Sequence, residues 1–84
     1  MVKKKEKVWL VKVKLYSGDV LEAPVIATNR TNAQNLGITR LQEYGEWFDT
    51  LDIKKVSVRP YSLEKAFDEF GYVFTSEGIR QEGE

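Results

Sequence analysis

Apolar and polar residues alternate over residues 8–16, which is the period of a β-strand with one buried face. One face of this predicted strand is apolar and the other carries two lysines: Trp9, Val11, Val13 and Leu15 against Lys12 and Lys14. The segment Ser17-Gly18-Asp19 has the composition of a tight turn, and residues 20–28 are predicted to return as the second strand of a hairpin. Because Pro24 has no N–H to donate, we expect this strand at a sheet edge or with a bulge.

Residues 29–45 have the spacing of an amphipathic helix. Asn29, Thr31 or Asn32 can supply the N-cap. Gly37 lies within the apolar side of the helix, where it permits close approach to a sheet, and Gly45 is expected to end the helix in a left-handed conformation. The apolar stripe consists of Ala33, Leu36, Leu41 and Tyr44.

A third strand is predicted over residues 53–61, with Val56 and Val58 facing inward. Ser62 is a suitable N-cap for a short helix that reaches Phe70, and residues 72–74 follow as a last short strand or a packed tail. In the connection before the third strand, Trp47 and Phe48 are both expected to close one end of the core. The outward positions of this strand are Lys55, Ser57 and Arg59.

This order of elements predicts one α+β domain over residues 8–74. Its three-stranded, mainly antiparallel sheet is built from a β-hairpin, a helix and a strand, with one main helix on one face and a short C-terminal helix. Residues 1–7 are interpreted as a basic flexible head and residues 75–84 as an acidic disordered tail. The second sheet face is expected to be open and to carry Lys12, Lys14, Glu22, Lys55 and Arg59.

Composition argues against catalysis. The chain of 84 residues contains no cysteine and no histidine. That excludes a disulfide scaffold, a cysteine or histidine zinc site, a thiol nucleophile and a histidine acid or base, so only a carboxylate site for magnesium or calcium is left for a metal. No phosphate-binding glycine loop or calcium-loop motif is present either. We therefore expect a protein without enzymatic activity and without a cofactor.

The apolar segments are short. None approaches the roughly 20 residues that a membrane-spanning helix needs, and Lys12 and Lys14 interrupt the apolar stretch that follows the basic start. Export is therefore not expected. The lack of cysteine fits a reducing compartment, and the sequence predicts a cytoplasmic protein without a membrane partner.

Charge is balanced overall but unevenly placed along the chain. The net charge is zero, yet residues 1–14 carry six lysines against one glutamate, and residues 61–84 carry two cations against six carboxylates. Both ends can steer partners or attract each other. Three surfaces are candidates for binding: the basic sheet face, an unpaired strand edge, and a patch that could mimic a phosphate backbone, formed by Glu43, Glu46, Asp49 and Asp52.

Short motifs in residues 8–61 resemble those of the small T7-type bacteriophage inhibitors of bacterial RNA polymerase. They are Glu22-Ala23-Pro24 in the second strand, Ala33 and Leu36 in the helix, and Val58-Arg59-Pro60 at the end of the third strand. The resemblance implies the same order of hairpin, helix and strand. It also implies that basic residues of the last strand bind the jaw region of the largest polymerase subunit. Arg59 matches one such position, Ser57 stands at another, and Lys55 is a nearby substitute.

The sequence therefore predicts a small non-enzymatic phage protein that takes over its host by binding and inhibiting a host protein, with bacterial RNA polymerase as the expected target. We expect it to act as a monomer in the host cytoplasm. A nucleic-acid-binding module and a self-associating accessory protein are the alternatives. The predicted partner-binding residues are Lys12, Lys14, Glu22, Lys55, Ser57 and Arg59.

Overall fold

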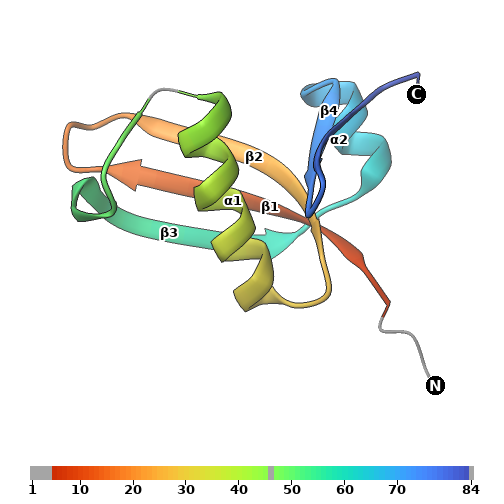
Figure 1. Ribbon diagram of the computed structural model, residues 1–84, viewed down its shortest axis with the longest axis horizontal. Coiled ribbons are helices and arrows are strands. Elements are labelled where there is room, and N and C mark those ends of the chain that lie inside the picture. The colour runs from red at the N-terminus through yellow and green to blue at the C-terminus, as the bar shows by residue number, and fades with distance from the viewer. Residues whose placement is uncertain (1–4, 46, 84) are drawn as a thin grey trace.

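The computed structural model describes residues 5–45 and 47–83, and has the predicted α+β class (Figure 1). A hairpin, a helix, a strand and a short helix follow one another as expected, and two further strands come after them. The elements are β1 (Lys7–Leu15), β2 (Val20–Ala27), α1 (Arg30–Tyr44), the 3-10 turn η1 (Thr50–Asp52), β3 (Ile53–Pro60), α2 (Leu63–Glu69), β4 (Tyr72–Thr75) and β5 (Gly78–Gln81).

The sheet has five strands in the order β3-β1-β2-β4-β5, so the prediction of three strands is wrong. β1 pairs antiparallel with both β2 and β3. β4 joins β2 in parallel at Val25 and Phe74, and β5 then pairs antiparallel with β4. The two short strands extend the sheet beyond the hairpin because residues 72–81 fold back beside β2.

Strand β5 lies in the segment that was expected to be a disordered tail. Ile79 is opposite Phe74 in the ladder and packs against the hydrophobic core. The turn before β5 is held by Arg40 of α1, whose Nε donates to the carbonyl of Thr75 at 3.2 Å and whose Nη2 donates to that of Ser76 at 3.0 Å. These contacts order a segment that is too polar to signal a strand by itself. At the other end of the chain, β1 already begins at Lys7, and residues 1–4 of the expected head lie outside the described residues.

Pro24 lies in an internal strand, not at an edge. The backbone N–H of Leu15 donates to the carbonyl of Asp19 at 2.9 Å, so the odd-numbered residues of β2 direct their backbone groups toward β1. By alternation, Ala23 and Val25 face β1, while the nitrogen of Pro24 faces β4. Within the described ladder β4 pairs with β2 only at Val25, so the missing N–H removes no bond from the hairpin.

Helix α1 crosses the sheet face that carries the buried odd-numbered positions of β1, including Val11 and Val13. Gly37 makes this approach possible, because a Cβ at that position would lie 2.7 Å from side-chain atoms of Val11. The helix begins as predicted, with the Asn29 side chain accepting from the backbone N–H of Asn32 at 2.8 Å. It ends at Gly45, but with φ −108° and not in the left-handed conformation.

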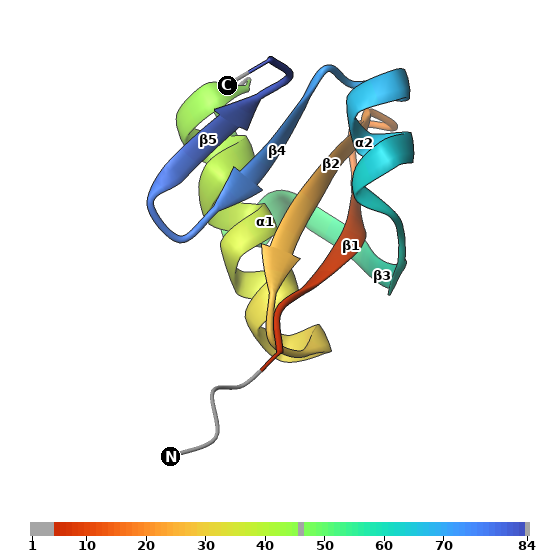
Figure 2. The same cartoon turned by 90° about the vertical axis from the view of Figure 1, so that its right-hand side faces the viewer.

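The second face of the sheet is only partly open, because α2 covers one end of it on the side opposite α1 (Figure 2). Leu10, Ala66 and Val73 are buried without belonging to the main cluster under α1. Ser62 caps α2 as predicted, its hydroxyl accepting from the backbone N–H of Lys65 at 3.1 Å. What is left exposed on this face is the part along β3 and toward the β1–β2 turn.

Candidate functional site

The strand register brings all six predicted partner-binding residues to one face of the sheet. Lys14 lies opposite Lys55, and Lys12 lies between Ser57 on one side and Glu22 on the other. Arg59 lies opposite Leu10 and follows Ser57 by two residues on the same face of β3. All six side chains are exposed on the face away from α1, which we call the basic sheet face: Lys12, Lys14, Glu22, Lys55, Ser57 and Arg59.

A shallow hollow of about 170 Å³ lies in this face, lined by Lys12, Lys14, Lys55 and Ser57. Within residues 5–45 and 47–83, the only ion pair joins Arg40 to Glu43, so none of these three lysines is neutralised by a carboxylate. Three ammonium groups beside one hydroxyl can bind a carboxylate or a phosphate group.

The basic surface continues at the end of β3 into a second hollow of about 250 Å³, which is lined by Arg59, Pro60, Tyr61, Ser62 and Lys65. The guanidinium carbon of Arg59 lies 5.7 Å from the ring centroid of Tyr61, within the range of a cation–π contact. Tyr61 in turn packs edge-on against Phe70 with 6.4 Å between centroids. Arg59 is thus supported by an aromatic platform at the junction with α2.

The hydroxyl of Tyr61 donates a hydrogen bond to the carboxylate of Glu69. Partial burial raises the pKa of Tyr61 to about 12, with further contributions from this hydrogen bond and from the negative charge of Glu69, while Arg59 acts in the opposite direction. The tyrosine is therefore neutral at physiological pH. Its hydrogen bond to Glu69 joins the loop after β3 to α2.

Sequence reasoning missed Lys65, which the structure adds to the Arg59 end of the surface. A signal for it was present. The Ser62 N-cap follows directly after the third strand, so the first turn of the next helix must lie beside the end of that strand.

The strand edges form a second candidate surface, and they belong to β3 and β5. The backbone N–H of Tyr61 donates to the carbonyl of Val8 at 3.0 Å, so the backbone groups of Val56 and Val58 point by alternation toward the open edge. Arg30 donates to the Val58 carbonyl, and Pro60 has no N–H. The β3 edge therefore has fewer backbone groups left to pair with another strand.

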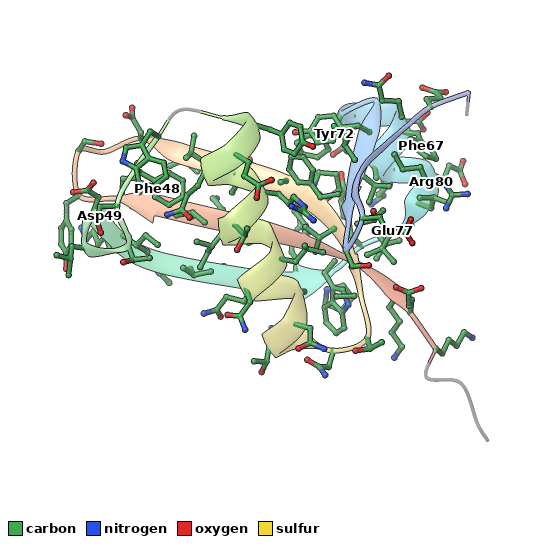
Figure 3. The ribbon with its side chains drawn as sticks, in the orientation of Figure 1. Phe48, Asp49, Phe67, Tyr72, Glu77 and Arg80 are labelled. Atoms are coloured by element: carbon green, nitrogen blue, oxygen red, sulfur yellow. The ribbon has the colours of Figure 1, made fainter. Side chains whose placement is uncertain are left out.

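Three of the four carboxylates of the predicted acidic patch have local partners in the structure. Glu43 pairs with Arg40 at 2.9 Å. Asp49 and Asp52 instead cap η1, with the backbone N–H of Asp49 donating to the Asp52 carboxylate at 3.0 Å. Glu46 lies outside the described residues. The carboxylates near η1 therefore have a local structural role at the end of the molecule where Figure 3 places Asp49.

The two adjacent aromatics of the connection have different environments. Phe48 is 3% exposed and belongs to the core, as predicted, whereas Trp47 is 76% exposed. The expectation that both would close the core is wrong for Trp47, because only Phe48 packs into the cluster under α1.

A comparison of the chain with models of known families, with curated proteins and with solved structures finds no match. No helix among the described residues has both the length and the apolar character needed to cross a membrane.

Proposed function

We propose that this protein is a non-enzymatic phage protein that binds and inhibits a host protein through the basic sheet face. The observation that carries this proposal is the gathering of six exposed residues from three strands on one face, with no ion-pair partner for Lys12, Lys14 or Lys55 within the described chain. Unpaired surface cations favour an acidic partner, since complementary charges accelerate association and select against basic surfaces.

The proposed target is the RNA polymerase of a bacterial host. This step rests on the resemblance of residues 8–61 to the phage inhibitors, in which basic residues of the last strand make the contact. Arg59 occupies such a position on β3, and its contact with the ring of Tyr61 holds the guanidinium at the rim of a hollow. A guanidinium held in this way can bind a carboxylate through two parallel hydrogen bonds.

The arrangement of aromatic residues favours a protein partner over a nucleic acid. Surfaces that bind single strands place exposed rings among their cations, so that bases stack on them. In the described part of the basic sheet face, the six residues include no aromatic side chain, and the nearby Tyr61 is engaged with Glu69 and Phe70. The zero net charge also differs from the basic character of most nucleic-acid-binding domains.

The first test is a pull-down from bacterial lysate with the tagged chain, treated with nuclease, followed by binding and transcription assays with purified polymerase. Arg59→Glu is expected to weaken polymerase binding about 30-fold, which corresponds to about 2 kcal/mol for a hot-spot residue. Arg80→Glu is the matched control, because Arg80 is exposed on β5 at the opposite edge of the sheet. The control is expected to bind within a factor of about two of the wild type.

Equal losses for the two substitutions would mean that binding depends on overall charge and not on the basic sheet face. Capture of one different host protein, sensitive to Arg59→Glu, would keep the inhibitor proposal and change its target. If no host protein survives nuclease treatment, the proposal is wrong.

A nucleic-acid-binding module is the second candidate, supported by the cationic hollow between Lys12, Lys14 and Lys55. It predicts affinity for a single-stranded oligonucleotide that falls steeply with salt, with a slope of about 0.7 per phosphate contacted. A chain that shifts no oligonucleotide in a gel even at low salt would rule this candidate out.

A further inference from the structure

Large apolar side chains are exposed together at the end of the molecule formed by the β1–β2 turn and η1. Exposure is 70% for Tyr16, 76% for Trp47 and 86% for Leu51. Figure 1 shows the turn and η1 side by side at this end, and the backbone N–H of Tyr16 donates to the carbonyl of Asp52 at 2.9 Å. Exposed apolar groups that cluster in this way mark a contact surface more often than scattered ones do.

Tyr16 and Trp47 border a pocket of about 270 Å³, which we call the hairpin-end pocket. This volume is below the roughly 300 Å³ from which small-molecule sites usually start, so it suits a single side chain. The lining residues are Leu15, Tyr16, Ser17, Asp19, Leu21, Trp47, Phe48 and Asp52.

The charges of the pocket define what can enter it. Among the described residues that line it, Asp19 and Asp52 are the only charged ones, and both are acidic. The Asp19 carboxylate accepts from the Ser17 hydroxyl at 3.3 Å, and that of Asp52 accepts from the backbone N–H of Asp49 at 3.0 Å. Neither has an ion-pair partner within the described residues. Two held carboxylates beside two exposed rings attract a cation.

We propose that the hairpin-end pocket binds a basic peptide segment of a partner protein, with one lysine or arginine side chain entering between Tyr16 and Trp47. The cation contacts the two ring faces and the carboxylates of Asp19 and Asp52. An aliphatic side chain that flanks this cation in the partner covers Leu51. The site is independent of the basic sheet face, which requires an acidic partner surface.

The test is an NMR titration of the isotope-labelled full chain with the peptide acetyl-Leu-Arg-Leu-Lys-amide. The control peptide has glutamate in place of arginine and lysine. The basic peptide is expected to shift the indole N–H signal of Trp47 in a saturable manner. The indole N–H of Trp9 donates to the carbonyl of Ala27 at 3.1 Å and is the internal reference that does not shift.

Two variants test the assigned contacts. Trp47→Ala is expected to weaken binding of the basic peptide about two- to fivefold, the effect of losing one exposed cation–π contact. The double substitution Asp19→Asn and Asp52→Asn keeps the hydrogen-bond acceptors, so that the turn and η1 stay capped, and is expected to abolish the preference for the basic peptide. The matched control for this loss of two charges is Asp68→Asn with Glu77→Gln, at the other end of the molecule.

Three results would overturn the proposal. The first is a shift of Trp47 by the acidic peptide that equals the shift by the basic one. The second is a binding curve that the aspartate substitutions leave unchanged. The third is a shift of the Tyr16 and Trp47 signals with protein concentration alone, which would assign the surface to a second copy of this chain.

Discussion

Lys14 and Lys55 lie directly opposite each other on neighbouring strands, and Lys12 follows on the same face. Like charges that face each other across a sheet are unfavourable for folding. Replacing Lys14 by glutamate turns this repulsion into attraction. We therefore expect Lys14→Glu to raise the free energy of unfolding while it weakens binding to an acidic partner.

The size of the effect follows from the geometry of the pair. Cα atoms of a hydrogen-bonded antiparallel pair are about 5.5 Å apart, and long side chains can spread to about 7 Å between their charged groups. Two unit charges at about 7 Å interact by about 0.6 kcal/mol in water. Reversing one sign changes the free energy of unfolding by about 1 kcal/mol, which for a domain of this size raises the melting temperature by about 4–8 °C.

Denaturant unfolding at low and high salt measures this gain. At about 1 M salt the Debye length falls to about 3 Å, so the difference between Lys14→Glu and the wild type should shrink to a few tenths of a kcal/mol. The double variant Lys14→Glu with Lys55→Glu restores two like charges and is expected to lose the gain that each single change brings.

Lys7→Glu is the matched control, because Lys7 lies on the same strand but opposite Ala27. If Lys7→Glu stabilises the protein as much as Lys14→Glu does, the effect belongs to overall charge and the pair argument fails. A gain for Lys14→Glu that does not change with salt would refute the electrostatic reasoning as well.

Three further predictions concern the scaffold. Gly37→Ala gains about 1 kcal/mol in helix propensity but places a Cβ 2.7 Å from the buried Val11. We therefore expect the free energy of unfolding, measured by chemical denaturation, to fall by about 1–2 kcal/mol. A rise instead would show that α1 can move away from the sheet. Asn29→Ala removes the N-cap of α1 and should cost about 1 kcal/mol in the same assay, while Asn29→Ser should retain most of the stability. The pKa of Tyr61 is raised from 10.0 to about 12 in the folded state, so its contribution to stability is present below pH 10 and is lost as the pH rises through 12. Between these pH values, the free energy of unfolding should fall more steeply in the wild type than in Tyr61→Phe. Identical pH profiles of the two proteins would contradict the link between Tyr61 and Glu69.

Strand alternation made the basic sheet face predictable. A period of two places Lys12 and Lys14 on one side of β1, and Lys55, Ser57 and Arg59 on one side of β3, whatever the neighbours of these strands are. The turn at Gly18, the Asn29 cap and the Ser62 cap were also readable, because each is a local interaction between residues a few positions apart. The bounds of β1, β2, β3 and both helices followed from these signals to within one or two residues.

A long-range signal was overlooked in the same pattern. Leu10 occupies the lysine-bearing side of β1, where an open face would call for a polar residue, and it lies opposite Pro24. These apolar positions indicate that something covers this end of the face. The structure supplies α2 as the cover, with Ala66 fully buried.

By itself, then, the sequence determined the elements and the side of each strand on which its charges lie, because those properties depend on neighbours in the chain. Only the tertiary structure decided that Lys14 faces Lys55, that β5 is ordered by Phe74 and Arg40, and that Trp47 stays exposed beside Tyr16 while Phe48 enters the core. Each of these outcomes depends on contacts between segments distant in the chain, and a polar four-residue strand or a pair of adjacent aromatics has no periodicity that specifies its partner.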